Sequence, residues 1–331
     1  MRGMATPEPT SAPRPRASIT VIVPSYNCGT LLGEALDSIL AQTVRVEQII
    51  VVDDGSTDDT AKVVGRFRNA RIQYIQRPHE GMASACNAGL DAARGEFITF
   101  LYPTDRWSPA FVERMHDYLA ADPEIACAFS NFVHVDHVTG KMIGEQFRNY
   151  PEIKRPVLLR DAPHAYGRIP KERAFGALVS CSDIPAYLQV MMFRRNAIQN
   201  LRLEPSLGPG ADTSFALQAF MRGMVVFTDE VLALVREPGS NGTPGQGAAP
   251  VDELNGLKAL APHVTRERDV TPYQERLIKA HIDAAISLAK AGQVRAGLRT
   301  YRGAFQSRGS GLRKFKGALR LLAALPRGVF K

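Results

Sequence analysis

Three groups of polar side chains in this chain are of types that could act together in one reaction. Tyr26 and Asn27 end one apolar run, and Asp53 and Asp54 end the next. A carboxylate accepts hydrogen bonds from a base N–H or a ribose hydroxyl, and an aromatic ring can stack on a base. Asp212, which follows two glycines further along the chain, could act as a general base. These residue types indicate nucleotide binding combined with proton transfer.

Strands and a helix must hold the first two groups in place. Runs of β-branched apolar residues at 19–23 and 49–52 predict buried parallel strands, and apolar residues at helical spacing over 31–40 predict a helix between them. In such a unit the polar groups meet at the carboxyl ends of adjacent strands, where open α/β sheets bind ligands.

Strands and helices continue to alternate through the following hundred or so residues. We expect further strands at 71–75, 97–101, 126–135 and 190–195, and helices at 82–93, 108–121 and 212–222. This alternation predicts an α/β fold: a mostly parallel sheet with helices on both faces, followed by a C-terminal helical appendage.

Several segments resemble, in order, the motifs of family-2 glycosyltransferases, which have the GT-A fold. Residues 23–27 read Val-Pro-Ser-Tyr-Asn and residues 52–58 read Val-Asp-Asp-Gly-Ser-Thr-Asp, nearly letter for letter the segments that form the family's nucleotide pocket. Two further segments between 80 and 101 also resemble the family pattern. The resemblance is strong over 17–110, weaker to about 236 and absent beyond.

The resemblance implies an inverting transferase that uses a nucleotide sugar. In the family, the aromatic residue matched by Tyr26 packs on the base and the position of Asp54 contacts the base, while Asp53 supports the loop or the ribose. The alternatives are a tyrosine at a strand end and acids that form turns or cap helices. We favour nucleotide binding. The expected nucleotide-binding residues are Pro24, Ser25, Tyr26, Asn27, Asp53 and Asp54.

The metal motif departs from the family pattern. Relatives carry Phe-Leu-Asp-x-Asp-Asp-x-Trp, whose acids hold Mg²⁺ or Mn²⁺ against the sugar diphosphate. Here residues 100–107 read Phe-Leu-Tyr-Pro-Thr-Asp-Arg-Trp, so Tyr102 and Thr104 replace the two spaced acids. We therefore expect the divalent cation to be weakly held or absent, with Asp105 as its one candidate ligand. In this diphosphate or metal region, Arg106 either neutralises phosphate or is a solvated surface charge.

Other residues near these motifs also bear on the interpretation. Cys86 stands where the family often has an arginine that approaches the nucleotide, and we expect it to pack within a helix. Trp107, the single tryptophan, is expected to be a packing anchor. The family's later Arg-x-His element appears as Arg236-Glu237-Pro238, without the histidine. The Gln-x-x-Arg-Trp signature of processive synthases is missing, which favours addition of a single sugar.

Asp212 is the candidate catalytic base. Relatives carry Glu-Asp before a helix, and here Ala211-Asp212 precedes one. Inverting transfer needs one base on the acceptor hydroxyl, opposite the departing nucleotide. A helix N-cap is the alternative role for this aspartate, and both roles can coexist.

Two functions follow from these residues. The first is transfer of a single sugar from a nucleotide sugar to a glycan or lipid-linked acceptor, as in polysaccharide biosynthesis of the cell envelope. The second, favoured by the altered segment 102–105, is a catalytically silent relative that binds nucleotide or glycan or scaffolds an assembly. A dinucleotide-dependent oxidoreductase is disfavoured because no Gly-x-Gly-x-x-Gly follows the first strand.

Composition divides the chain into regions. The start is rich in Pro, Ser, Thr and Ala and lacks the apolar core of a secretory signal. The expected regions are a disordered tail (1–16), a transferase domain (17–240) with nucleotide-binding (17–135) and acceptor-side (136–240) parts, a linker (241–270), and a basic helical region (271–331).

The basic C-terminal region has the features of a membrane-binding helix. Residues 284–331 hold eleven Lys or Arg and no Asp or Glu, although the whole chain has a net charge of only +8. Apolar residues recur there at helical spacing: Leu312, Phe315, Leu319 and Leu322. This pattern is typical of a helix lying on anionic lipid, and the alternative is a helix packed on the body with a solvated basic face. Nucleic acid is not expected as a partner, because no groove-reading module accompanies the charge.

The location expected from composition is cytoplasmic, with peripheral attachment to the inner face of the membrane if the tail binds lipid. The four cysteines are scattered without metal-ligand spacing, which fits a reducing compartment. No stretch approaches the roughly 18 apolar residues of a membrane span.

Overall fold

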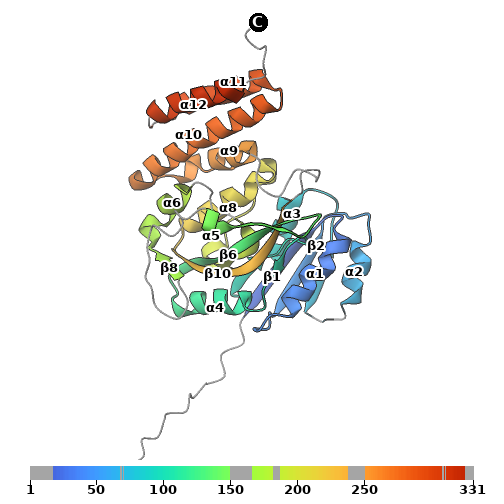
Figure 1. The fold of residues 1–331 in the computed structure, drawn as a ribbon. Coiled ribbons are helices and arrows are strands. Elements are labelled where there is room, and N and C mark those ends of the chain that lie inside the picture. The colour runs from blue at the N-terminus through green and yellow to red at the C-terminus, as the bar shows by residue number, and fades with distance from the viewer. Residues whose placement is uncertain are drawn as a thin grey trace, which may run out of the picture.

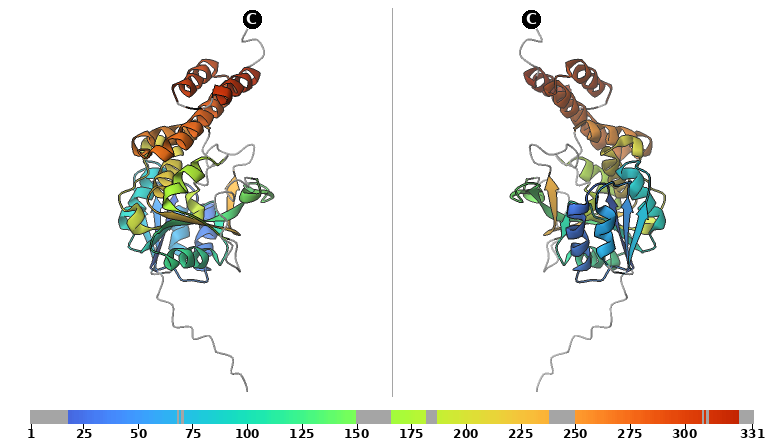
Figure 2. Two further views of the ribbon diagram at one scale, coloured as in Figure 1. Left: turned by 90° about the vertical axis from the view of Figure 1, so that its left-hand side faces the viewer. Right: turned by 90° about the vertical axis from the view of Figure 1, so that its right-hand side faces the viewer.

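The structure is a computed structural model that describes residues 18–67, 69, 71–149, 166–181, 187–237, 250–307, 309 and 311–324. The expected disordered tail, residues 1–16, lies outside the described residues. The described chain forms an α/β body from which a set of helices projects (Figures 1 and 2).

The N-terminal half is a parallel α/β unit. Its strands pair in the order β3-β2-β1-β4, all in parallel. The strands are β1 (Ile19–Ser25), β2 (Gln48–Asp53), β3 (Ile72–Gln76) and β4 (Phe97–Phe100), and the connecting helices are α1 (Gly29–Leu40), α2 (Thr60–Arg66) and α3 (Met82–Ala92). The strands and helices predicted here are confirmed.

Burial explains why these segments form this unit. All seven residues of β1 are buried, and α1 buries the apolar stripe that contains Leu32, Leu36 and Ile39. Helix α3 crosses back over the sheet and approaches β1 closely, since a Cβ at Gly89 would lie 2.3 Å from Ile22 Cγ2. Together these contacts bring the ends of β1, β2 and β3 to one edge of the sheet.

The second half of the sheet is mixed. The order continues β4-β9-β6-β10-β5, with β9 antiparallel to both neighbours and β10 parallel to β6, while β7 and β8 pair at the side with β6 and β10. Its strands are β5 (Arg106–Trp107), β6 (Ile125–Asp136), β7 (Met142–Glu145), β8 (Tyr166–Ile169), β9 (Met191–Arg194) and β10 (Met224–Glu237). Its helices are α4 (Phe111–Ala121), α5 (Gln146–Asn149), α6 (Lys171–Val179), η2 (Leu188–Val190), α7 (Arg195–Ile198), η3 (Pro205–Leu207) and α8 (Gly210–Phe220).

Helices make up the described C-terminal part, which begins inside the segment expected to be a linker. Its elements are α9 (Pro250–Ala259), η4 (Ala261–His263), α10 (Glu267–Lys290), α11 (Val294–Gln306) and α12 (Gly311–Ala324). The described residues of the range expected to be a linker, 250–270, are largely helical. Leu254 and Leu257 of α9 are buried, and a Cβ at Gly256 would lie 2.4 Å from Gly210 O of α8. The Gly- and Pro-rich composition just before α9 favoured a linker, and local sequence patterns do not predict the packing of α9 on α8.

The helices α10, α11 and α12 form a layer of their own beyond the body (Figure 1). The buried side chain of Arg276 links α10 to the body, because it pairs with Glu253 of α9 and donates to Cys181 O at 2.8 Å. A separate apolar cluster, which includes Ile278, Ile282 and Leu321, joins α10 to α11 and α12. The expected helical hairpin after residue 277 is present as α10 and α11.

Candidate active site

The loops after β1 and β2 are bonded to each other through Asn27. Its backbone N–H donates to Ser56 Oγ at 2.9 Å, and its side-chain Oδ1 accepts from Thr57 N at 2.8 Å. Asn27 adopts a positive φ of 50°, a conformation that asparagine tolerates better than most residues. The Asn27 side chain therefore connects the two loops.

Asp53, the last residue of β2, holds the loop that follows this strand. One carboxylate oxygen accepts from Ser56 N at 2.8 Å and the other accepts from the Tyr74 hydroxyl of β3. Asp53 is only 1% exposed. These two bonds connect the end of β2 to the loop that follows it and to β3.

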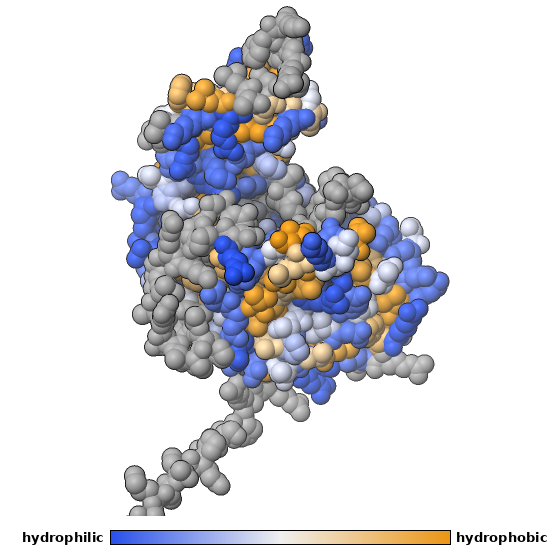
Figure 3. Space-filling view, viewed as in Figure 1, coloured by the Kyte–Doolittle hydropathy of each residue, from blue (hydrophilic) through white to orange (hydrophobic). Residues whose placement is uncertain are grey.

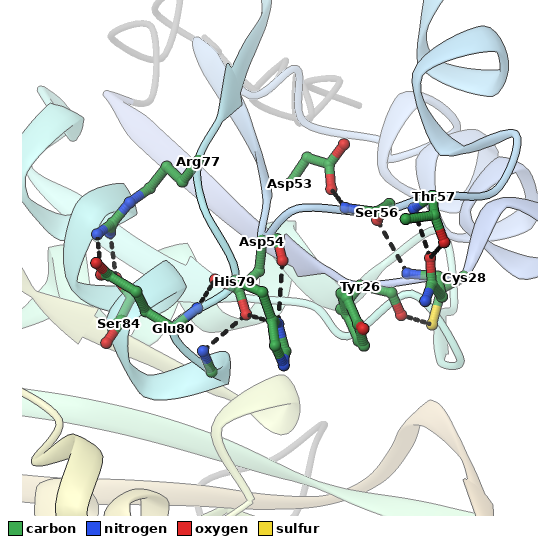
Figure 4. A network of polar contacts seen from close by, with 12 residues as sticks. Tyr26, Cys28, Asp53, Asp54, Ser56, Thr57, Arg77, His79, Glu80 and Ser84 are labelled. Atoms are coloured by element: carbon green, nitrogen blue, oxygen red, sulfur yellow. Dashed lines mark hydrogen bonds and ion pairs between the residues drawn. The ribbon is translucent and has the colours of Figure 1, made fainter.

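Asp54 bonds to the loop that follows β3. Its Oδ1 accepts from Glu80 N at 3.0 Å and its Oδ2 accepts from Gly81 N at 2.8 Å (Figure 4). Gly55, with φ of 80°, permits this approach, because a Cβ there would lie 2.9 Å from His79 N. The carboxylate also lies just before α3, where backbone amides favour negative charge.

His79 covers both residues expected to bind the base. Its ring stacks on Tyr26 with centroids 4.0 Å apart, and its Nδ1 lies 2.8 Å from Asp54 Oδ2 (Figure 4). The sequence interpretation missed His79. The rule that located the first two loops could have found it, because His79 is a polar residue just beyond the carboxyl end of the next parallel strand.

Pro24 and Ser25 belong to β1 itself. Both are buried and lie opposite Val52 and Asp53 of β2 in the parallel register. Ser25 Oγ has no hydrogen-bond partner among the described residues. The two residues thus lie within the sheet, directly before Tyr26.

Asp212 and Tyr102 form a hydrogen-bonded pair at a second part of the site. Asp212 lies in the first turn of α8, and Tyr102, which follows β4, donates its hydroxyl to Asp212 Oδ2. Asp212 Oδ1 is enclosed and has no hydrogen-bond partner among the described residues. Burial raises the pKa of Asp212 to about 7, and the Tyr102 hydroxyl opposes that rise. The N-cap of α8 is Pro209, so the alternative role of Asp212 as the N-cap is not the one observed.

Cys86 lies between the two parts of the site. Its thiol is fully buried, and burial raises its pKa well above the ordinary value, with the carboxylates of Asp212 and Asp54 adding to the rise. A thiol whose ionisation is opposed in this way is not a nucleophile at neutral pH. Cys86 is a packing residue of α3, as expected.

Asp105, the one acid left in the metal motif, is turned toward β10. It is 1% exposed, and its Oδ1 accepts from Arg236 N at 3.0 Å and from Thr104 Oγ1 at 3.1 Å. The Arg236 guanidinium in turn donates to Thr104 O at 2.8 Å. Arg236 therefore bonds to both Thr104 and Asp105, a role that sequence reasoning did not assign to it.

Arg106 and Trp107 have separate partners. The guanidinium of Arg106 pairs with Glu34 Oε2 of α1 at 3.1 Å, and Arg236 pairs with the same oxygen at 2.6 Å. The Trp107 indole stacks on Phe111 and donates to Gln189 O at 2.7 Å, which makes it the packing anchor that was expected.

The residues of the metal motif do not fit a resident divalent cation. Mg²⁺ and Mn²⁺ prefer several hard oxygen ligands, usually with one or two carboxylates. The segment offers one carboxylate, and one oxygen of that carboxylate is already bonded to a backbone amide. Within the described ranges, no group of three or more His, Cys, Asp or Glu side chains is arranged to hold a metal ion.

Two polar loops at the carboxyl ends of adjacent parallel strands, joined to a mixed half that supplies a buried carboxylate, define the GT-A class of glycosyltransferase. Residues 20–175 match the family model described as glycosyl transferase family 2. This matched segment, a little under half of the chain, contains the motifs quoted above, and the resemblance predicted from them is confirmed.

Relatives and solved structures agree with this assignment. The chain is 32% identical over 142 residues to a chondroitin synthase of Pasteurella multocida, an alignment that covers 42% of this chain and 14% of that synthase. It is 29% identical over 144 residues to the Escherichia coli UDP-Glc:alpha-D-GlcNAc-diphosphoundecaprenol beta-1,3-glucosyltransferase WfaP, covering 43% of this chain and 55% of WfaP. The chain thus spans only part of the length of these relatives.

The fold itself extends further than these alignments. The crystal structure of Staphylococcus aureus TarS 1-349 in complex with UDP-GlcNAc superposes with a TM-score of 0.59 at 15% identity, covering 93% of this chain and 89% of that one. At this identity the likeness shows the fold alone, and it confirms the predicted GT-A-like α/β class with C-terminal helices.

Proposed function

We propose that this chain transfers a single sugar from a nucleotide-sugar donor to a glycan or lipid-linked acceptor, with inversion and with Asp212 as the general base. The observation that carries the proposal is the buried carboxylate of Asp212, which Tyr102 holds by one oxygen while the other is enclosed and without a partner among the described residues. A carboxylate with a pKa of about 7 is half deprotonated at neutral pH, which suits proton abstraction from a hydroxyl.

The proposed reaction is a single displacement. The Asp212 carboxylate takes the proton of the acceptor hydroxyl as the hydroxyl oxygen attacks the anomeric carbon. A new C–O bond forms on one face of the sugar while the bond to the nucleoside diphosphate breaks on the other, so the configuration inverts. The proton remains on Asp212 and the diphosphate leaves with the electron pair.

We assign binding of the nucleotide-sugar donor to the loops after β1, β2 and β3. Tyr26 supplies an aromatic face and Asp54 a charged acceptor, while Asn27 and Asp53 hold the loops in place. The proposed reaction does not include a resident cation, because the oxygen ligands around Asp105 do not fit one. An acceptor with a lipid diphosphate is one option, since such a group appears in the name of WfaP.

The test is a donor panel. Release of nucleoside diphosphate from UDP- and GDP-sugars would be measured with and without Mn²⁺ and with oligosaccharide or lipid-linked acceptors. Acceptor-dependent release by the wild type supports the proposal, and its loss in Asp212→Asn assigns the base. No release with any donor would favour the alternative function, a catalytically silent protein that binds nucleotide or glycan. The hydrogen bond from Arg236 N to Asp105, the one acid of the metal motif, supports this alternative.

Attachment to an anionic membrane through α11 and α12 is the second part of the proposal. Phe305, Phe315 and Leu319 are 60%, 62% and 52% exposed, and Arg302 and Lys316 beside them in the chain are exposed cations. Figure 3 shows apolar side chains among hydrophilic ones over these projecting helices. In the described part of the chain no helix is long and apolar enough to cross a membrane. The side chains of Leu312 and Leu322, expected on the same face, lie outside the described residues.

This attachment can be tested without disturbing the core. The double variant Phe315→Ser/Leu319→Ser should lose most binding to vesicles of phosphatidylglycerol and phosphatidylcholine, and wild-type binding should weaken as salt rises. The matched control is Met142→Ser/Ile143→Ser, which removes two apolar side chains of β7 that are each 61% exposed. Equal sedimentation of both double variants with the vesicles would contradict the attachment.

A further inference from the structure

The two groups proposed to recognise the nucleotide base are both engaged by one side chain of the protein. His79 stacks on Tyr26 at an interplanar angle of 19° and places Nδ1 2.8 Å from Asp54 Oδ2 and 3.1 Å from Asp54 O. An imidazole is a flat aromatic ring with a ring N–H. It therefore makes the two kinds of contact, stacking and hydrogen bonding to a carboxylate, that a nucleotide base would make at the same groups.

A base could not reach Asp54 while His79 stays in this position. The side chain of Asp54 is 2% exposed, and its oxygens already accept from Glu80 N and Gly81 N. His79 adds a third contact at Oδ2. A base that bonds to Oδ2 would therefore have to take the place of the imidazole.

Removal of His79 from this place needs only rotation of its side chain. The side chain is 54% exposed, so it can turn toward solvent without repacking the core. Its backbone, in contrast, is fixed. The 77–81 loop is tied to Asp54 by two amides, and it approaches Gly55 so closely that no Cβ would fit there.

We infer that His79 occupies the base position in the free protein and is displaced when a nucleotide binds, so that it lowers the affinity of the site for nucleotides. This inference rests on the proposed donor function. Every nucleotide then binds in competition with the imidazole, so a base must stack on Tyr26 and bond to Asp54 better than His79 does. A residue that contacts the bound base directly would have the opposite effect when removed.

Calorimetry with UDP and with GDP tests the inference on the full chain. His79→Ala should lower the Kd for the preferred nucleotide about three- to tenfold, the range expected when a competing aromatic stack is removed. Tyr26→Ala should raise it. The matched control is His263→Ala, which removes an exposed imidazole from η4 and should leave the Kd unchanged.

A second measurement serves if His79→Ala does not fold. In wild-type protein labelled at its seven histidines, the His79 ring resonances should be shifted by the Tyr26 ring and should move toward solvent-exposed values on addition of nucleotide. Weaker binding by His79→Ala, or His79 resonances that stay in place as nucleotide saturates the protein, would overturn the inference. Absence of nucleotide binding in the wild type and in His79→Ala would instead overturn the donor function on which it rests.

Discussion

The nucleotide loops and the segment 102–105 lie at the ends of neighbouring strands. They differ in how far along the chain the hydrogen-bond partners of their polar groups lie. In the loops, Asp53 accepts a hydrogen bond from Ser56 N, three residues on, and Asp54 accepts one from Glu80 N, 26 residues on. In the segment, the tyrosine that replaces an acid bonds to Asp212, 110 residues away, and Asp105 bonds to Arg236, 131 residues away.

The difference shows how a site can keep its shape after its motif has changed. Where the family pattern is intact, its residues bond to one another, as Asn27 does to Ser56 and Thr57. Where the pattern is altered, residues from distant parts of the chain make hydrogen bonds with the Tyr102 hydroxyl and the Asp105 carboxylate. The changed segment therefore has defined partners at Asp212 and Arg236, and experiments can ask what chemistry it supports.

The largest effect is expected from Asp212→Asn. Loss of the proposed base should lower kcat about 10²- to 10⁴-fold while leaving the Kd for the nucleotide unchanged. Asp269→Asn is a matched control, because Asp269 is also buried with a raised pKa but lies in α10. A rate in Asp212→Asn above a tenth of the wild-type rate would remove Asp212 from the mechanism.

Asp54→Ala tests the intact side of the comparison. Loss of a charged hydrogen bond should weaken nucleoside diphosphate binding by about 1.5–3 kcal/mol, which calorimetry can measure. Asp59→Ala removes an exposed acid from the same loop and should have no such effect. Unchanged affinity in a folded Asp54→Ala protein would remove Asp54 from the pocket.

Tyr102→Phe tests the altered side. The hydroxyl lowers the pKa of Asp212, so its loss should raise that pKa further. Because the base must be deprotonated, the acid limb of the kcat profile should move to higher pH, and kcat at pH 7 should fall about tenfold. Tyr273→Phe, which loses a buried hydroxyl bonded to Leu257 O in the C-terminal helices, should leave the profile in place. The same profile in both variants would show that Tyr102 does not tune Asp212.

The smallest effect concerns the missing metal ligand. Thr104→Asp restores a carboxylate beside Asp105 and should tighten Mn²⁺ binding in the presence of nucleotide by about three- to tenfold. Thr139→Asp, in an exposed turn, is the control. Tight Mn²⁺ binding by the wild-type protein alone, with activity lost in chelator, would contradict the interpretation of this segment.

Local patterns were sufficient for much of the fold. The strands that contain Val21 and Val51 and the helix that contains Leu36 follow from short-range periodicity, and the structure confirms them. The antiparallel insertion of β9 between β4 and β6 could not be predicted, because strand direction depends on contacts between distant segments. Helix α9 was missed because its packing on α8 is likewise a long-range contact.

The candidate site shows the same division. Asn27 lies in the loop after β1 and Asp53 ends β2, at the strand ends where their motifs placed them. The role of Arg236 was not visible, because its partner Thr104 lies 132 residues away. His79 was accessible to the strand-end rule, but its stacking on Tyr26 is a tertiary contact that the rule does not provide.

The buried carboxyl of Asp212 also affects how firmly the chain is folded at different pH values. In an unfolded chain an aspartate titrates near pH 3.9, whereas burial raises this one to a pKa of about 7 in the fold. Between these values the folded protein retains a proton that the unfolded chain has released, so the free energy of unfolding falls as pH rises through this window. The deprotonated form proposed to accept the acceptor's proton is thus the form in which this residue favours unfolding most.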